Sequence, residues 1–184
     1  MRTLRAHNPN DVTGRDKVDW SANVSWNNLR FMPYNGAIGG EQLAWLHAQL
    51  NASARDNVVI FSHVPLYPRD DAPMTLLWNY EQVLEEVFRA RSRVLAVFSG
   101  HEHEGGYVRS VPDGVHHITV PSPLEGRGSE LNSFVILRAY EDRLEVEGHG
   151  AAPSFVIDAG LSSPTRERTR RRRLVRRHRH VADG

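Results

Sequence analysis

The sequence predicts an α/β domain in which strands and helices alternate through the first half of the chain. Two short apolar runs, Asn57–Ser62 and Val94–Phe98, have the continuous β-branched and aromatic composition of strands that are buried on both faces. The amphipathic segment Asn79–Arg91 lies between them, so the order is strand, helix, strand. Polar loops that carry histidine follow both strands, and ligands of open α/β sheets bind at such carboxyl ends.

The helices and loops of this half follow from local patterns. Residues 8–37 are rich in Asn, Gly, Pro and Asp and show no periodicity, so a long irregular segment is expected. The first helix is predicted over Glu41–Leu50, where leucines recur at helical spacing. In Asn79–Arg91 the apolar positions form one stripe, and Asn79 and Gln82 have the spacing of a capping box.

The second half predicts further strands. Val115–Val120, Ser133–Tyr140 and Arg143–Gly148 have the composition of antiparallel strands. The last two are separated by Glu141–Asp142, which has the length of a two-residue hairpin turn. These elements complete a predicted domain over residues 1–160.

Residues 161–184 form a basic tail of a different composition. Residues 165–184 hold nine arginines against Glu167 and Asp183, a net charge of +7, whereas the whole chain carries +1 and the remainder therefore −6. A segment with so many like charges and so few apolar residues cannot bury a core, so the tail is expected to be disordered.

Composition excludes several functional classes. The chain of 184 residues has no cysteine, which excludes disulfides, thiolate zinc sites and cysteine nucleophiles. No apolar run approaches the roughly 18–20 residues that a membrane span needs, and no signal-like stretch follows the first charges, so the expected location is cytoplasmic. The glycine motifs of serine hydrolases, phosphate loops and dinucleotide sites are also absent from the sequence.

Three histidines occupy positions that indicate metal binding. His63 follows the first buried strand, and His101 and His103 follow the second, between Gly100 and a Gly-Gly pair. In an extended loop two residues at i and i+2 project to one side, and neutral imidazole is the commonest protein ligand of transition metals. His116 and His117 lie at adjacent strand positions and face opposite ways, so they are expected on the surface or in the core.

The motifs around these histidines resemble a known family. Ser62-His63-Val64-Pro65 and Gly100-His101-Glu102-His103 resemble the last two metal-binding motifs of the calcineurin-like metallophosphoesterases. Asn35-Gly36, Trp78-Asn79-Tyr80 and the extension from Glu104 to Tyr107 resemble the manganese-dependent ADP-ribose/CDP-alcohol diphosphatase branch.

The resemblance implies a β-sandwich flanked by helices, with two divalent ions at the strand ends, manganese being expected and zinc or iron being alternatives. His63 and His101 would bind one ion and His103 the other, and Asn35 and Tyr107 would lie on the substrate side. The implied substrate is a nucleotide diphosphate such as ADP-ribose or a CDP-alcohol. The implied reaction is attack on phosphorus by a water that the ions activate.

The sequence also departs from the family. The Asp-x-His, Gly-Asp-x-x-Asp and Gly-Asn-His-Asp/Glu motifs of the first half of such enzymes do not occur in it, so it resembles the C-terminal portion and its own activity is expected to be incomplete. Two other functions stay open: a non-catalytic remnant, and a nucleic-acid binder acting through the arginine tail. Against the second, no aromatic residue lies among those arginines to stack on bases.

Overall fold

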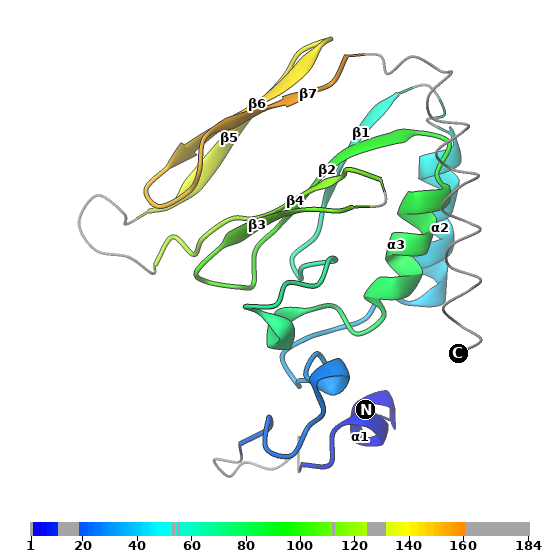
Figure 1. Ribbon diagram of the computed structural model, residues 1–184. Coiled ribbons are helices and arrows are strands. Elements are labelled where there is room, and N and C mark those ends of the chain that lie inside the picture. The colour runs from blue at the N-terminus through cyan, green and yellow to red at the C-terminus, as the bar shows by residue number, and fades with distance from the viewer. Residues whose placement is uncertain are drawn as a thin grey trace.

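A computed structural model of the chain describes residues 2–10, 19–52, 54, 56–111, 113–124 and 132–160. These residues form three layers (Figure 1). Two helices cover one face of a four-stranded sheet, and a three-stranded sheet lies against its other face. The predicted α/β class and the β-sandwich flanked by helices are therefore confirmed. The basic tail, residues 161–184, lies outside the described residues.

The four-stranded sheet is built on the predicted strand–helix–strand unit. β1 (Asn57–Phe61) and β2 (Arg93–Ser99) are parallel neighbours, and α3 (Tyr80–Arg89) connects them. α2 (Gly40–Ala52) precedes β1 and packs beside α3 on the same face of the sheet (Figure 1). All four elements lie where the sequence predicts them, within two residues at either end.

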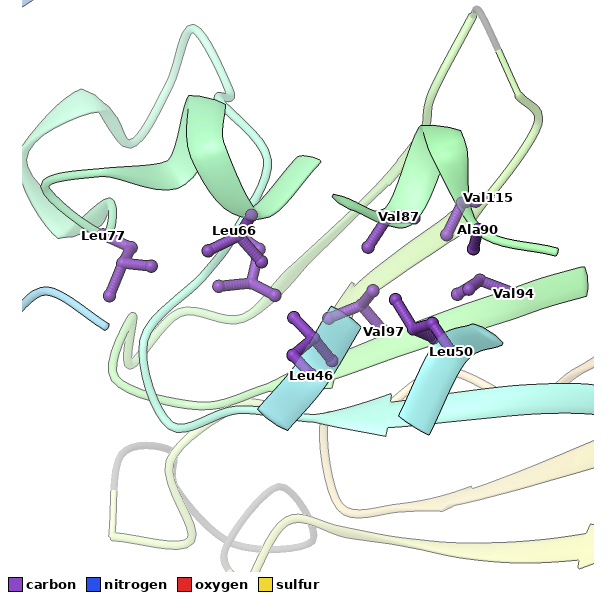
Figure 2. Packing of buried hydrophobic residues seen from close by; sticks show 10 residues of the cluster. Leu46, Leu50, Leu66, Leu77, Val87, Ala90, Val94, Val97 and Val115 are labelled. Atoms are coloured by element: carbon purple, nitrogen blue, oxygen red, sulfur yellow. The ribbon is translucent and has the colours of Figure 1, made fainter. Parts of the chain in front are cut away.

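The larger apolar core fills the layer between the helices and this sheet (Figure 2). Leu46 and Leu50 of α2 and Val87 of α3 lie close to Val94 and Val97 of β2. Residues of the adjoining loops also belong to the cluster. The buried members of this cluster are Leu46, Leu50, Leu66, Leu77, Val83, Val87, Ala90, Val94, Val97 and Val115.

β2 contains one more residue than β1 in the stretch where they pair. Val58 pairs with Val94, but Val59 pairs with Ala96, so Leu95 has no partner on β1. Such a bulge changes the alternation of side chains. Val94 and Val97 both face the helix layer as a result, while Leu95 and Ala96 belong to the core between the two sheets.

The sheet continues in a way that the sequence did not predict. β4 (His116–Thr119) is antiparallel only to β3 (Gly106–Arg109), and it runs parallel to β2. The order is β1-β2-β4-β3. The loop after β2 reverses the chain into β3, and the next turn reverses it again, so β4 has the direction of β2. β3 has four residues and begins at a glycine, too short and irregular to show alternation.

The second sheet is antiparallel, as the sequence predicts for two of its strands. β5 (Phe134–Ala139) pairs with β6 (Arg143–His149), and β6 pairs with β7 (Phe155–Asp158), which the sequence did not predict. The Tyr140 N–H donates to the Arg143 carbonyl at 2.9 Å and closes the predicted two-residue turn. Inward residues of β6 and β7 pack against Phe98 and Ile118 of the first sheet.

Outside these layers the chain is largely irregular, as expected. It contains a short helix that the sequence did not predict, α1 (Arg2–His7), and the 3₁₀ turns η1 (Trp26–Asn28) and η2 (Pro73–Thr75). Asn79 is the N-cap residue of α3, but its side chain makes no capping hydrogen bond to the helix backbone. Its amide bonds the N–H and the carbonyl of Ile38 at 3.0 Å each and donates to Oε1 of Gln82 at 2.8 Å. Among the described helices none is long and apolar enough to span a bilayer.

His117 is a buried histidine in the core of the sheet. It is 6 % exposed, its ring lies 4.7 Å from that of Tyr67, and neither ring nitrogen has a hydrogen-bond partner among the described residues. Burial lowers the pKa of His117 from 6.5 to about 4; the smaller effect of Asp113 raises this pKa, and that of His116 lowers it further. The native state therefore holds this ring neutral at pH values where the unfolded chain protonates it.

We expect the stability of the protein to fall as the pH drops from 6.5 to 4. The unfolded state binds the proton first in this window, so the stabilisation is complete above pH 6.5 and is lost toward pH 4. The interval between 6.5 and about 4, at about 1.4 kcal/mol per pKa unit, corresponds to about 3 kcal/mol. Urea unfolding at pH 7 and pH 5 measures the part of this loss that falls between these two values, about 2 kcal/mol. His117→Phe keeps the ring stacking but cannot titrate, so its loss should be clearly smaller, and an equal loss in both proteins would contradict the assignment.

Candidate metal centre

The three predicted ligands lie at the carboxyl ends of two neighbouring parallel strands. His63 follows β1, and His101 and His103 follow β2. All three line one cleft of about 680 Å³ that opens between the two sheets. The other side chains of the cleft are mostly apolar or small and come from both sheets: Phe61, Phe98, Val120, Pro121, Pro123, Phe134, Val135 and Leu137.

Backbone hydrogen bonds continue past the strands and hold the two histidine-bearing loops together. The Ser62 N–H donates to the Phe98 carbonyl at 2.9 Å, and the Gly100 N–H donates to the His63 carbonyl at 3.0 Å. The His63 and His101 rings therefore meet edge to face, with 5.1 Å between their centroids. The two residues of this pair are separated by 38 positions in the sequence.

The loop that carries His101 and His103 is turned rather than extended. His101 has φ +69°, the Glu102 N–H donates to the Gly100 carbonyl at 2.7 Å, and the Gly105 N–H donates to that of Glu102 at 3.1 Å. The prediction that His101 and His103 project to one side assumed an extended loop, and that assumption is wrong. His103 still lines the same cleft, and the Ser122 N–H donates to its carbonyl at 2.9 Å.

Asn35 bonds directly to one of the histidines. Its Oδ1 lies 2.7 Å from Nε2 of His101, and its Nδ2 donates to the carbonyls of Arg30 and Met74 at 2.8 and 2.7 Å. The residue is only 6 % exposed. Asn35 is not among the residues that line the cleft of the three histidines, and its place on the substrate side stays a prediction.

The surroundings favour the neutral form of His101. Burial lowers the pKa of His101, and the neighbouring His63 and His103 lower it further, while Glu102 acts in the opposite direction. The ring of Tyr34 lies 5.8 Å from that of His101. A neutral imidazole has the lone pair that a metal ion needs, so the electrostatics suit a ligand.

Arg69 bonds the far end of the same loop, a contact that no sequence pattern predicts. Its Nη1 donates to the Gly105 carbonyl at 3.0 Å, and its Nε and Nη2 bond the Asp71 carboxylate at 3.0 and 2.7 Å. A Cβ on Gly106 would overlap the guanidinium group, so any other residue there would displace the Arg69 side chain. The Gly-Gly pair signals a close approach in the sequence, but not which side chain approaches.

Tyr107 does not line the cleft of the three histidines. It is half-exposed on β3, its hydroxyl lies 2.9 Å from Nδ1 of His116, and its ring lies 5.6 Å from that of Phe155. It borders a second hollow with Arg69, Glu104 and the Gly-Gly pair. Its place on the substrate side stays a prediction.

The donors in the cleft suit a transition metal but do not enclose one. Within the described part of the chain, no group of three or more His, Asp or Glu residues is placed to hold an ion. Of the nearby carboxylates, Asp71 is engaged by Arg69, and Glu102 lines the cleft with one oxygen 3.4 Å from the Glu104 N–H. The imidazoles that line this cleft therefore suit a metal ion chemically, but within the described part of the chain they do not form a complete site.

Comparison with known proteins bears on what this cleft does. The model of the calcineurin-like phosphoesterase family matches residues 4–105. The manganese-dependent ADP-ribose/CDP-alcohol diphosphatases of Bos taurus and of rice are 32% and 37% identical over 160 and 151 residues, which are 86% and 80% of this chain and 44% of each relative. A dimetal phosphatase from Danio rerio superposes with a TM-score of 0.72 at 33% identity, covering 86% of this chain and 49% of that one. The chain thus spans about half the length of the proteins it matches.

Proposed function

Because this chain belongs to the calcineurin-like phosphoesterase family, we propose that its cleft is the histidine side of a dinuclear metal site that hydrolyses a phosphoester or diphosphate bond. The observation that carries the proposal is the meeting of His63 and His101 at the ends of adjacent parallel strands, in a cleft that His103 also lines. The metal is manganese and the substrate is a nucleotide diphosphate of the ADP-ribose or CDP-alcohol kind. The names of the relatives support both assignments.

The residues of the chain contribute binding and orientation. Divalent ions at the cleft would supply Lewis-acid stabilisation of phosphoryl oxygens and a water of lowered pKa. His63 and His101 would hold one ion and His103 the other, each as a neutral imidazole. Arg69 keeps the loop of His101 and His103 in its turned conformation through the Gly105 carbonyl. Phe61, Phe98 and residues of β5 form an apolar wall on one side of the cleft.

The ligands that the cleft lacks must come from elsewhere in the functional enzyme. A dinuclear site needs a bridging carboxylate to hold two ions about 3.5–4 Å apart. Neither Glu102 nor Asp71 is placed with the three histidines as such a group within the residues that the structure describes. The chain therefore supplies part of the site, which accords with its match to about half of each relative.

Binding of Mn²⁺ by the chain tests this assignment. We expect weak binding in calorimetry, and a loss of at least about tenfold in affinity for His101→Ala/His103→Ala, because even outer-shell partners of metal ligands are worth 10–100-fold. His178→Asn/His180→Asn is introduced into every protein compared, so that histidines of the tail do not contribute.

The matched control is His47→Ala/His149→Ala, which removes two imidazoles outside the cleft. These histidines pair with Glu86 and Glu147 and should leave the affinity unchanged. Equal affinity in the wild type and in the His101/His103 variant would remove the basis for the metal site.

A further inference from the structure

We propose that Asn35 is a positioning residue that fixes His101 in the tautomer protonated at Nε2, and so leaves Nδ1 as the atom that binds the ion. This inference deepens the proposed function, and only its last part, that Nδ1 binds the ion, rests on that function. The assignment of the tautomer follows from hydrogen bonds of this chain alone.

The orientation of the Asn35 amide is determined by its two backbone partners. The carbonyls of Arg30 and Met74 lie 2.8 and 2.7 Å from one end of the amide. Carbonyl oxygens only accept hydrogen bonds, so this end must be the NH₂ group, which has two protons to donate. The other end is therefore the oxygen, and a flipped amide would place three oxygens together.

The oxygen of Asn35 then determines which ring nitrogen of His101 carries the proton. It lies 2.7 Å from Nε2, and because an amide oxygen cannot donate, Nε2 must carry the hydrogen. A histidine that binds a metal is neutral and holds a single ring proton. With that proton on Nε2, the lone pair that remains is on Nδ1.

The position of Asn35 makes this hydrogen bond rigid. The residue is 6 % exposed, and its N–H donates to the Met32 carbonyl at 3.1 Å in a turn. The next residue, Gly36, accepts from the Trp78 N–H at 2.9 Å. The amide thus joins three parts of the chain, the turn before α2, the segment at Met74 and the loop after β2. Both amide protons and the oxygen are engaged, so contact with substrate is not the role that the geometry assigns to Asn35.

The Asn35 oxygen stabilises the Nε2–H tautomer of His101 relative to the Nδ1–H tautomer. If Asn35 loses its oxygen, Nε2–H of the half-buried ring has no acceptor, and the Nδ1–H tautomer or a rotated ring becomes as favourable. A ligand nitrogen that is protonated part of the time binds an ion less tightly. Groups that orient metal-bound imidazoles through the second nitrogen are worth 10–100-fold in metal affinity.

The tautomer can be measured without metal or substrate. The full chain is labelled with ¹⁵N-histidine at pH 7.5, and two-bond ¹H–¹⁵N correlation spectra are recorded. The His101 signals are identified by their loss in His101→Gln. We expect the wild type to show a protonated Nε2 and an unprotonated Nδ1. A protonated Nδ1 in the wild type would overturn the proposal.

Variants separate positioning from a general structural role. Asn35→Leu keeps the side-chain volume and removes the acceptor, and we expect the Nδ1 and Nε2 signals of His101 to move toward averaged values. Asn79→Leu is the control, because that amide bonds the nearby Ile38 backbone without touching His101, and its His101 signals should be those of the wild type. Unchanged His101 signals in folded Asn35→Leu would overturn the proposal. If Asn35→Leu does not fold, Asn35→Ser takes its place under the same criterion.

Binding of Zn²⁺, a diamagnetic probe, completes the experiment. We expect a fall of about 10–100-fold in affinity for Asn35→Leu and none for Asn79→Leu. The failures of the two proposals are distinguishable. An Nε2–H tautomer in a wild type that binds no ion would refute the metal site but not the positioning. A metal-binding wild type with the opposite tautomer would refute the positioning alone.

Discussion

The isolated 184-residue chain with Mn²⁺ is expected to release AMP from ADP-ribose, or CMP from CDP-choline, no faster than its His101→Ala/His103→Ala variant. The reason is the number of ligands. The cleft offers three imidazoles, and the described residues contain no complete metal-holding group. Without a bridging carboxylate a second ion is not retained, and much of the water activation and charge stabilisation is lost with it.

We expect a fusion protein to show manganese-dependent release of AMP or CMP. It joins this chain to the portion of the Bos taurus relative that the chain does not match, in the order that the relative has. The rate of release should rise by at least about 10²-fold, because a proton donor to the leaving group alone typically contributes about 10²–10⁴-fold. The joined protein that carries His101→Ala/His103→Ala is the control and should be inactive. Robust turnover by the isolated chain, abolished in its own double variant, would show that the three histidines suffice and that the site is complete.

Gly105→Ala is expected to have the largest effect on stability among the glycine variants of the histidine loop. Gly105 has φ +72°, and a Cβ there would lie 2.6–2.9 Å from the ring and nitrogen of Pro121. The left-handed conformation costs a non-glycine residue about 1–2 kcal/mol, and overpacking against a rigid ring adds about 1–3 kcal/mol. A loss of about 3 kcal/mol should lower Tm by roughly 10 °C at this chain length.

Gly100→Ala provides the matched control in the same loop. Its Cβ would come no nearer than 3.7 Å to the His63 ring, an ordinary contact, and its φ is not positive. We expect a change in Tm of a few degrees at most, measured by differential scanning calorimetry beside Gly105→Ala. Similar shifts for the two variants would mean that Pro121 yields to the added methyl group and that the loop is not held by this contact.

The parts of the fold that the sequence predicts correctly are those with patterns longer than one turn or one short strand. The stripe in Asn79–Arg91 and the buried runs that became β1 and β2 require many residues to agree. β3 and β7 have four residues each, and the direction of β4 depends on β3. Strand direction is a property of the path of the chain, which composition does not record.

Some features of the candidate site could likewise be predicted from the sequence, and others could not. The family resemblance is confirmed by the matched family and relatives, and the histidines of the two motifs do share one cleft. Their ligation of metal stays a prediction. The parts that the sequence could not supply are contacts between distant residues, because Asn35 is 66 positions from His101 and Arg69 is 36 from Gly105. No periodicity connects residues that meet only once in the folded chain.

The single unpaired residue in β2 determines which residues stand opposite each other at the cleft. Because Leu95 has no partner, Phe61 is opposite Phe98, and the next hydrogen bonds place His63 beside Gly100. A β2 without that residue would advance the whole loop by one position, about 3.3 Å along the strand, and turn each later side chain to the opposite face. The bulge at Leu95, six residues before His101, therefore determines how far apart the His63 and His101 rings lie, although it contacts neither ring.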